Sequence, residues 1–325
     1  MDGRPKVLIS RSIPQAALEI VARECQVEVN ERDVRLTQEE LIERLLEKEG
    51  LLCLLTDRVD AAVLAAAPRL RVVANVAVGY DNIDVAEASR RGILVTHTPG
   101  VLTETTADLT WALLLAVARR VVEADRYVRS GQWREWGLQL LLGSDVHGKV
   151  LGILGFGRIG QAVARRGMGF GMQNLYHSRR RASPEVEAAL KARYVDPETL
   201  LREADFVSLH LPLTPETTHF LTAREFSWMK PTAYLINTAR GPIIREEDLV
   251  EALRMGRIAG AGLDVYEREP TLAPGLTDLP NVVLAPHIGS SSVETRTRMA
   301  VMAAENLTAA LAGRRPPNPV NPEIP

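Results

Sequence analysis

The sequence predicts an α/β protein with two doubly wound domains, each a parallel sheet covered by helices. Short apolar runs alternate with amphipathic helical patterns along almost the whole chain, as they do in such sheets. A glycine-rich turn, Gly155-Phe-Gly157-Arg-Ile-Gly160, stands between an apolar run and a helical pattern near the middle of the sequence. The chain has 325 residues, which is long for a single hydrophobic core and favours two domains.

Residues 6–100 alternate strands and helices in the manner of a complete parallel sheet. A capping-box pattern, Thr37 followed by Glu40, marks the start of one helix. The expected strands are 7–10, 27–29, 51–55, 72–74 and 94–96, and the expected helices are 14–23, 37–48, 61–67 and 85–90. Because this alternation does not need the glycine-rich turn, we expect the segment to form a domain of its own.

A break is expected at Pro99-Gly100, because both residues interrupt regular structure. Beyond it, Thr105 to Asp108 can cap one long helix that extends to about Val128. The apolar side of this helix is broad for one face of a domain. That breadth indicates either contact with a second subunit or burial within the same chain, and the pattern does not separate the two.

The second half of the chain supplies a further sheet, with strands expected at 150–154, 173–178, 206–210, 233–237, 260–264 and 282–284 and helices between them. A last helix is expected from a second capping box, Ser291 to Glu294, as far as Leu311. The proline-rich residues 316–320 cannot be helical and should form an extended tail. Because the chain leaves the second sheet near Pro286, the last helix can pack back on the first domain. We therefore expect one domain from residues 1–100 with 289–325, and an inserted domain from residues 101–288.

The glycine-rich turn has the context of a dinucleotide site, since a strand precedes it and a helix follows. Gly155 allows the tight turn, Gly157 lets backbone N–H groups approach a pyrophosphate, and Gly160 lets the helix pack against the strand. Without that context, a glycine cluster marks only a turn. With it, the inserted domain is expected to be a Rossmann dinucleotide-binding domain, and the surrounding domain a flavodoxin-like substrate domain.

The end of the next strand indicates which dinucleotide is bound. An NAD site normally carries an acid about 20 residues beyond the glycines, but here Ser178 stands near that position and Arg179, Arg180 and Arg181 follow. A carboxylate would repel a 2′-phosphate, whereas an arginine makes a charge-assisted hydrogen bond to it. The alternative is a basic loop tip that only faces water. We therefore expect NADP(H) to be preferred, with NAD(H) possible.

Composition excludes several other classes of protein. The formal net charge is −2, which gives no indication of a nucleic-acid surface. No apolar run reaches about 20 residues, the length of a membrane span, and the first residues lack the apolar core of a signal peptide. Cys25 and Cys53 have no metal-binding or redox spacing and fit buried thiols in a reducing compartment. We therefore expect a cytoplasmic protein that binds no nucleic acid, membrane or metal.

Polar residues follow three strands of the second sheet, where ligands of such sheets bind. They are Arg240, the acids Asp264, Glu267 and Glu269, and His287. Taken singly, each has an ordinary structural explanation, such as an ion pair or a solvated loop. Taken together, they match the reduction of a 2-keto acid. A histidine supplies the proton that follows hydride transfer, a neighbouring carboxylate fixes its tautomer and favours its charged form, and an arginine grips the substrate carboxylate.

These stretches also resemble a known family, the D-isomer-specific 2-hydroxyacid dehydrogenases. The resemblance covers nearly the whole chain through Leu151–Gly160, Asn237–Gly241, Gly262–Val265, Glu269-Pro270 and Pro286–Ser290. It is greatest to the glyoxylate/hydroxypyruvate reductases of the family, through residues 52–57, 75–84 and 176–180. It implies reduction of small 2-keto acids, glyoxylate and hydroxypyruvate, to the 2-hydroxy acids glycolate and D-glycerate.

The resemblance implies a role for individual residues. The catalytic trio would be Arg240, Glu269 and His287, with Glu269 rather than Glu267 matching the acid before proline. The amides of Val78 and Gly79 would bind the substrate carboxylate beside Arg240. The remaining substrate contacts implied are Leu54, Trp136 and Ser290. The cofactor contacts implied are Gly155, Gly157, Arg158, Ile159, Gly160, Ser178, Arg179, Arg180, Pro212, Thr238, Asp264 and Gly289.

The family resemblance further implies a homodimer formed through the nucleotide domain, in which Trp136 of the neighbouring subunit closes the pocket. Two alternatives in function remain open from the sequence. One is an NAD-dependent dehydrogenase for another D-2-hydroxy acid. The other is a dinucleotide-sensing, corepressor-like protein, because such proteins with this fold keep the same trio.

Overall fold

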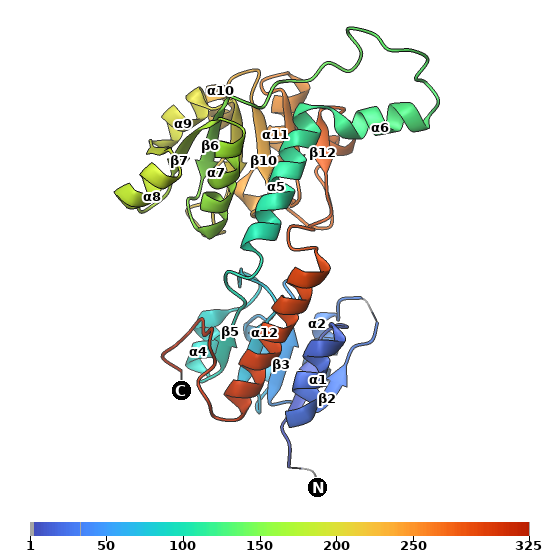
Figure 1. Cartoon of the computed structure of the whole chain (residues 1–325). Helices are drawn as coiled ribbons and strands as arrows, with labels where there is room; N and C mark the ends of the chain where they lie inside the picture. Colours follow the sequence, from blue (N-terminus) through green and yellow to red (C-terminus); the bar gives the residue numbers. More distant parts are fainter. Residues whose placement is uncertain (1–2, 33, 325) are drawn as a thin grey trace. The chain divides into compact units, whose positions relative to one another are not determined.

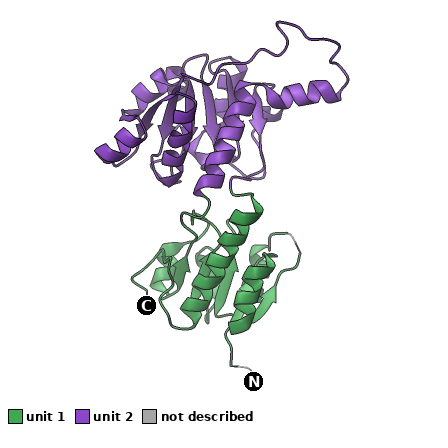
Figure 2. Ribbon diagram, in the orientation of Figure 1, with its two compact units in different colours: residues 1–102, 290–325 green, residues 103–289 purple. Residues whose placement is uncertain are grey.

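The computed structural model describes residues 3–32 and 34–324. The chain divides into two compact units, Met1–Leu102 with Ser290–Pro325 (unit 1) and Thr103–Gly289 (unit 2) (Figure 2). Each unit is a parallel sheet with helices on both faces (Figure 1). The predicted α/β class with two doubly wound sheets is therefore confirmed.

The sheet of unit 1 has the strand order β2-β1-β3-β4-β5, which is the flavodoxin-like order. Its strands are β1 (Lys6–Ile9), β2 (Gln26–Val29), β3 (Gly50–Cys53), β4 (Val72–Asn75) and β5 (Leu94–Thr96). Its helices are α1 (Gln15–Glu24), α2 (Gln38–Leu45), α3 (Ala61–Ala66), α4 (Val85–Arg90) and α12 (Val293–Leu311). The capping box of Thr37 and Glu40 is present at the start of α2, as predicted.

Both faces of this sheet are buried, as a parallel sheet requires. Successive strand residues point to opposite faces, so Val7 and Ile9 of β1 join the core under α1 and α12 while Leu8 joins the core under α2, α3 and α4. Helix α12 brings Met299 and Leu307 into the first of these cores. The final helix therefore completes a domain that the first hundred residues begin.

The sheet of unit 2 has the order β12-β11-β10-β9-β6-β7-β8, in which the first strand in sequence, β6, lies between the two halves as in a Rossmann fold. Its strands are β6 (Val150–Leu154), β7 (Gln173–His177), β8 (Ala192–Tyr194), β9 (Phe206–Leu209), β10 (Tyr234–Asn237), β11 (Gly260–Leu263) and β12 (Val282–Leu284). Its α-helices are α5 (Thr103–Ala118), α6 (Val121–Arg129), α7 (Arg158–Gly169), α8 (Pro184–Ala189), α9 (Pro197–Glu203), α10 (Ala223–Trp228) and α11 (Glu246–Arg254).

Two apolar cores again separate the faces of the sheet. Helices α5 and α7 cover Ile153 and Ile236 on one face, and α9, α10 and α11 cover Leu154 and Leu235 on the other.

The carboxyl ends of β6, β10, β11 and β12 share one edge of the sheet, because all the pairings between these strands and their neighbours are parallel. The glycine-rich turn and the three groups of polar residues from the sequence all follow strands at this edge.

The predicted long helix after Pro99-Gly100 is wrong in two respects. It begins at Thr103, so Thr105 lies inside α5 and does not cap it. It is also interrupted at Arg120, which has a left-handed backbone (φ 54°) and separates α5 from α6. The side chain of Arg120 stabilises this break by binding both carboxylate oxygens of Glu123 at 2.8 Å and the backbone oxygen of Leu142 at 3.2 Å.

The start of the last helix also differs from the prediction. Ser292, not Ser291, is the N-cap, and its hydroxyl accepts a hydrogen bond from Thr295 N at 3.1 Å, so the predicted box with Glu294 does not form. The short strand β8 was not predicted. The proline-rich tail is non-helical, as expected, and Pro319 forms an antiparallel bridge with Thr96. Among the described helices, none is long and apolar enough to cross a bilayer.

Candidate active site

The glycine-rich turn connects β6 to α7, and its three glycines have different local requirements. Gly155 has a left-handed backbone (φ 98°), and a Cβ there would lie 2.5 Å from the carbonyl group of His210. A Cβ on Gly160 would lie 2.2 Å from the oxygen of Gly155. A Cβ on Gly157 would meet nothing within 4 Å. Packing within the chain therefore requires Gly155 and Gly160 but not Gly157, which leaves open space at the N-terminus of α7, where a pyrophosphate fits.

The end of β7 presents two exposed arginines. Ser178 donates from Oγ to the backbone oxygen of Arg180 at 2.5 Å, and the side chains of Arg179 and Arg180 are exposed. Arg181, in contrast, binds both carboxylate oxygens of Glu187, each at 2.8 Å. All three arginines are therefore exposed, and Arg181 differs from the other two in being paired with Glu187.

Glu187 is held firmly in that pair. The hydrogen bonds from Arg181 and from the hydroxyl of Tyr176, the latter at 2.6 Å, lower the pKa of Glu187 to about 2. The ring of Tyr176 is buried and stacks on Phe156 of the glycine-rich turn, with 3.9 Å between ring centroids. Arg181, Glu187 and Tyr176 thus form a chain of contacts between the loop after β7 and the glycine-rich turn.

The next strand end of this edge, after β9, carries His210 and Pro212. Burial lowers the pKa of His210 to about 3, so the ring is neutral. Its Nε2 lies 2.8 Å from the hydroxyl of Ser208. The backbone oxygen of Pro212 accepts a hydrogen bond from Thr217 Oγ1 at 2.7 Å. This segment borders the glycine-rich turn, since the carbonyl group of His210 lies where a Cβ on Gly155 would fall.

The loop after β10 is closed by the side chain of Asn237. Its Nδ2 donates to the backbone oxygen of Arg240 at 2.9 Å, and its Oδ1 accepts from Ala239 N at 3.0 Å. Within the loop, Thr238 is buried and its Oγ1 lies 2.8 Å from Oγ1 of Thr110 on α5. No role of Asn237 or Thr110 was predicted from the sequence. An asparagine directly after a strand is a recognisable sign of such a side chain-closed turn.

The structure brings Glu269 and His287 together. Glu269 Oε2 lies 2.8 Å from His287 Nδ1, while its Oε1 accepts a hydrogen bond from Tyr266 N at 3.1 Å. His287 has a left-handed backbone (φ 55°), which a residue other than glycine adopts only when its surroundings hold it there. Because Nδ1 faces the carboxylate, Nε2 is the ring nitrogen that remains for another partner.

Asp264 holds the backbone that carries His287. Its two carboxylate oxygens accept hydrogen bonds from Ile288 N and Gly289 N, both at 2.7 Å, and its backbone oxygen accepts one from His287 N at 2.9 Å. Asp264 is 1% exposed. Burial raises the pKa of Asp264, although the two N–H groups and the charge of His287 oppose that effect.

The electrostatics of Glu269 favour its ionised form. Burial alone would raise the pKa of Glu269, but the hydrogen bond and charge of His287, the N–H of Tyr266 and the charge of Arg240 outweigh burial and lower it. Arg240 is half-buried, and its Nη1 donates to the backbone oxygen of Ala239 at 2.8 Å. A carboxylate, an imidazole and a guanidinium therefore lie in one electrostatic environment at the edge of the sheet.

Glu267 does not bind His287 but makes contacts with His219 and Glu246. Its Oε1 lies 2.8 Å from Nε2 of His219, and its Oε2 accepts from Glu246 N at 2.9 Å. Glu246 is 5% exposed and accepts hydrogen bonds from Glu267 N and Ala273 N, which flank Glu269 in sequence. This second carboxylate–histidine pair was not predicted, because the partners are far apart in the chain and carry no shared motif.

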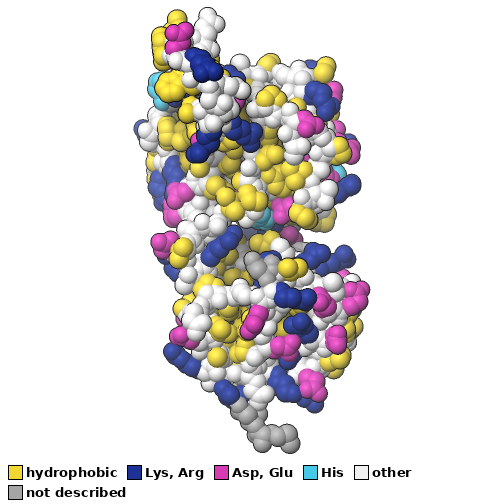
Figure 3. Space-filling model, turned by 90° about the vertical axis from the view of Figure 1, so that its right-hand side faces the viewer, with side chains coloured by type: hydrophobic (Ala, Val, Ile, Leu, Met, Phe, Trp, Pro, Cys, Tyr) yellow, Lys and Arg dark blue, Asp and Glu magenta, His cyan; other side chains and the backbone are white. Residues whose placement is uncertain are grey.

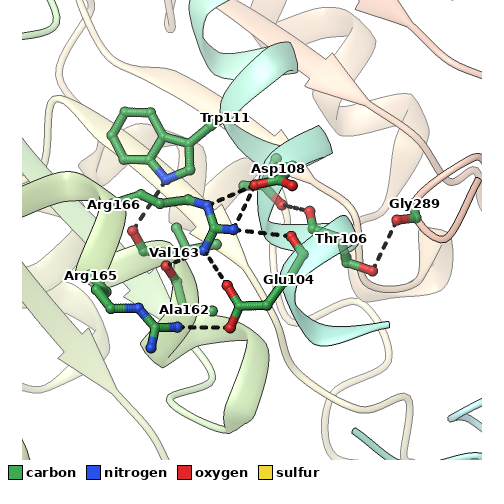
Figure 4. Close-up of polar contacts among 10 residues, drawn as sticks. Glu104, Thr106, Asp108, Trp111, Ala162, Val163, Arg165, Arg166 and Gly289 are labelled. Atoms are coloured by element: carbon green, nitrogen blue, oxygen red, sulfur yellow. Dashed lines mark hydrogen bonds and ion pairs between the residues drawn. The ribbon is translucent and has the colours of Figure 1, made fainter. Parts of the chain in front are cut away.

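Helix α5 supports the site from the same unit. Arg166 of α7 pairs with Asp108 of α5 at 2.6 Å, and Trp111 Nε1 donates to a backbone oxygen of α7 at 3.2 Å (Figure 4). Near the start of α5, Thr106 Oγ1 donates to the backbone oxygen of Gly289 at 3.1 Å. The glycine-turn helix and the His287 loop are thus both attached to α5.

The substrate contacts named from the sequence are divided between the two units. Leu54, Val78, Gly79 and Ser290 belong to unit 1, where each is half-buried. Trp136 belongs to unit 2 but is 76% exposed, so its side chain is not packed against the site of its own chain. Among the described residues, no group of three or more His, Cys, Asp or Glu side chains is placed to hold a metal ion.

The fold and this edge of the sheet define an oxidoreductase, and comparison with known proteins gives the family. Residues 111–289 match the model of the D-isomer specific 2-hydroxyacid dehydrogenase, NAD binding domain. The chain belongs to this family, as the sequence resemblance indicated. The family model and the glycine-rich turn agree on a nicotinamide dinucleotide as the cofactor.

The relatives are similar over their full length. The chain is 53% identical over 327 residues to a glyoxylate reductase of Aeropyrum pernix, covering 99% of this chain and 97% of that protein. It is 51% identical over 325 residues to a glyoxylate reductase of Thermococcus litoralis, covering 99% and 98%. A solved structure of an NADPH-dependent glyoxylate/hydroxypyruvate reductase from Sinorhizobium meliloti, in complex with NADP and malonate, is 34% identical with a TM-score of 0.89 and covers 99% and 98%.

Proposed function

We propose that the protein reduces glyoxylate and hydroxypyruvate to glycolate and D-glycerate with NADPH as the preferred reductant. The observation that carries this proposal is the 2.8 Å contact between Glu269 and His287, at the edge of the sheet that also bears the glycine-rich turn. The glyoxylate reductases to which the chain is 51–53% identical support the choice of substrate. In this proposal unit 2 binds the dinucleotide and unit 1 is the substrate domain.

The proposed mechanism assigns a task to each polar group. When bound, the reduced nicotinamide supplies a hydride to the keto carbon of the substrate. Arg240 and the amides of Val78 and Gly79 bind the substrate carboxylate, and Arg240 also polarises the keto oxygen. His287 donates the proton from Nε2 to the developing alkoxide. Glu269 holds the Nδ1–H of His287, which fixes the orientation of the ring and stabilises its charged form.

The preference for NADPH rests on the exposed arginines. Arg179 and Arg180 follow Ser178 directly, at the strand end where NAD-binding members carry an acid. Arg181 is bound by Glu187, so Arg179 and Arg180 are the two proposed to bind the 2′-phosphate. The solved relative from Sinorhizobium meliloti, which is described as NADPH-dependent and contains NADP, supports this choice.

The test is a panel of substrates assayed with both cofactors. Initial rates are measured for glyoxylate, hydroxypyruvate and a bulky 2-keto acid such as phenylpyruvate, each with NADPH and with NADH. The proposal predicts the highest kcat/KM for the two small substrates with NADPH. A preference for the bulky acid with NADH indicates a dehydrogenase of another D-2-hydroxy acid instead. Absence of turnover with every substrate, together with cofactor-dependent binding of a protein partner, indicates a corepressor-like function.

We also propose that the protein is a homodimer formed through unit 2. The segment from α6 to residue 142 carries apolar side chains that are mostly exposed, and Figure 3 shows hydrophobic side chains gathered on this face. They are Val121, Val128, Trp133, Trp136, Leu138 and Leu142. Beside them, α5, α6 and β12 line a hollow of about 320 Å³ that includes Val117, Val122 and Val282. Exposed apolar side chains gathered on one segment support a protein–protein interface, and a second copy of the segment matches them in chemistry.

The oligomeric state is tested by sedimentation velocity. The double variant L138D/L142D places two carboxylates on the proposed interface and should sediment as a monomer, whereas the wild type should sediment as a dimer. M255D is the matched control, because Met255 is 66% exposed on unit 2 but lies outside the segment. A monomeric wild type, or an L138D/L142D variant that remains dimeric, contradicts the proposal.

A cytoplasmic location is part of the proposal and rests on the thiols. Cys25 and Cys53 are both free and buried. Burial, with the neighbouring Glu24 charge, raises the pKa of Cys25 to about 11, and burial also raises the pKa of Cys53. Such protonated, buried thiols fit a reducing compartment.

A further inference from the structure

The loop formed by residues 76–80 of unit 1 has backbone carbonyl groups that bind two side chains. Val78 O lies 2.9 Å from His97 Nδ1, and since a carbonyl oxygen only accepts, Nδ1 must carry the proton. The next carbonyl oxygen, Gly79 O, accepts a hydrogen bond from Asn75 Nδ2 at 3.0 Å. Two consecutive peptide groups are therefore fixed in orientation by side chains from outside the loop.

The geometry of the peptide group decides where the N–H groups of the loop point. In a trans peptide, the N–H is directed opposite to the C=O of the preceding residue. Binding of Val78 O and Gly79 O therefore turns the N–H groups of Gly79 and Tyr80 away from His97 and Asn75. The preceding carbonyl, Ala77 O, accepts from the backbone N of residue 98 at 2.8 Å, which orients the N–H of Val78 in the same way.

These three N–H groups remain available to a ligand. In the part of the chain that the structure describes, the N–H groups of Val78, Gly79 and Tyr80 donate no hydrogen bond to another group of the protein. Exposure also rises along the loop, from buried Ala77 through half-buried Val78 and Gly79 to Tyr80, which is 42% exposed. Successive backbone N–H groups without internal partners are the donors from which proteins build anion sites.

The two side chains that orient the loop are themselves held in place. Asn75 is completely buried, and its Nδ2 also donates to Asn82 Oδ1 at 3.0 Å. Asn82 in turn donates to the backbone oxygens of Leu54 and Asp57, at 3.2 and 3.0 Å. This partly buried chain of hydrogen bonds joins the ends of β3 and β4, so Asn75 can orient Gly79 O with little freedom to move.

His97 is held by different elements of unit 1. Its backbone oxygen accepts a hydrogen bond from Asn306 Nδ2 on α12 at 3.1 Å. Its ring meets the ring of Tyr80 edge-on, with 5.6 Å between centroids and 80° between planes. The orientation of Val78 O therefore depends on a contact to the last helix as well as on the loop itself.

We propose that Asn75 and His97 are positioning residues for recognition of the substrate carboxylate. By holding the carbonyls of residues 78 and 79, they direct the N–H groups of Gly79 and Tyr80 toward the carboxylate. The hydrogen bond from Thr98 N to Ala77 O directs the N–H of Val78, which gives the anion three backbone donors. This inference rests on the proposed function, in which the first two of these amides bind that carboxylate. Neither Asn75 nor His97 needs to touch the substrate.

The test compares two His97 variants that separate the hydrogen bond from the ring. H97F keeps an aromatic ring beside Tyr80 but has no donor for Val78 O, whereas H97N keeps a donor near the position of Nδ1 but has no ring. H147F is the matched control, because His147 is exposed and lies in unit 2. For each variant, KM for glyoxylate, KM for NADPH and kcat are measured, with the affinity for oxalate determined by calorimetry in the presence of NADPH.

We expect H97F to raise KM for glyoxylate and Kd for oxalate about five- to tenfold, which corresponds to the loss of about one hydrogen bond. KM for NADPH should stay unchanged, and H97N should recover most of the loss. The inference is overturned if H97F leaves KM for glyoxylate and Kd for oxalate unchanged, or if it raises KM for NADPH equally. It is also overturned if H97N binds glyoxylate and oxalate no better than H97F does. Turnover of glyoxylate by the wild type tests the proposed function separately. Oxalate binding compares the variants without any turnover. Failure of the proposed function and failure of this inference are therefore distinguishable.

Discussion

The two exposed arginines after β7 give a prediction that separates the cofactors. In the double variant R179A/R180A, the groups proposed to bind the 2′-phosphate are removed while Arg181 stays bound to Glu187. Because NADH has no 2′-phosphate, its binding should not change. The variant should therefore lose affinity for NADPH alone.

The size of the effect follows from the exposure of these side chains. A hydrogen bond to a charged group contributes about 1.5–3 kcal/mol, and the lower end of that range applies because both arginines are exposed. Each arginine should then account for about a tenfold rise in KM for NADPH, and the double variant for about 100-fold if both bind the phosphate. kcat at saturating NADPH should change little, since neither arginine lies in the Glu269–His287 cluster.

The assay measures initial rates at saturating glyoxylate while NADPH or NADH is varied. R181A is the matched control, because it removes an arginine from the same loop whose guanidinium binds Glu187. The reasoning is refuted if KM rises equally for NADPH and NADH in R179A/R180A, or if R181A alone reproduces the selective loss of NADPH. In the reverse experiment, S178D should shift the preference toward NADH, because a carboxylate repels the 2′-phosphate.

Four further predictions concern the catalytic edge and the glycines. H287Q should lower kcat by about 10²–10⁴-fold through loss of the proton donor, and near-normal turnover of glyoxylate would contradict that role. The pKa of Glu269 lies below its usual 4.5, so the carboxylate stays ionised as pH falls from neutral. Its contribution to kcat/KM should be lost only when pH falls through that lowered pKa. An acid limb in kcat/KM that is caused by Glu269 and centred above pH 5 would contradict this prediction. In G241A, the new Cβ would lie 1.8 Å from the backbone carbon of Tyr266, so urea denaturation should show a loss of about 1–3 kcal/mol or more in the free energy of unfolding. G157A, which meets nothing within 4 Å, should unfold like the wild type but raise KM for the cofactor, and the reverse pattern between the two variants would refute the packing argument.

The sequence predicts the position of a site residue well when that residue directly follows a strand. Parallel strands end at the same edge, so Arg240, Glu269 and His287 could be expected to approach one another although they are far apart in the chain. The glycine-rich turn was predictable for a similar reason, because its spacing reflects local backbone geometry. A contact between His287 and an acid could be expected from the strand ends. The choice of Glu269 as that acid came from the family resemblance.

Other features depend on contacts that no local pattern records. The break at Arg120 occurs without glycine or proline, and it is stabilised by an ion pair and by a backbone oxygen more than twenty residues later. Among three adjacent arginines, sequence gives no reason for Arg181 to be the one that binds Glu187. The orientation of Val78 O by His97 joins two loops through tertiary packing. Each of these is decided by side chains that meet only after the strands are paired.

The origin of α12 has a consequence for synthesis of the chain. One core of unit 1 contains Met299, Ala303 and Leu307 packed with residues of α1, β1 and β4, so α1 alone covers that apolar face of the N-terminal sheet until the last helix has been synthesised. Unit 2 is continuous in sequence and can bury its own cores earlier. Unit 1, whose synthesis starts first, should therefore complete its folding last. It is also the unit in greater need of protection by chaperones while the polypeptide is being synthesised.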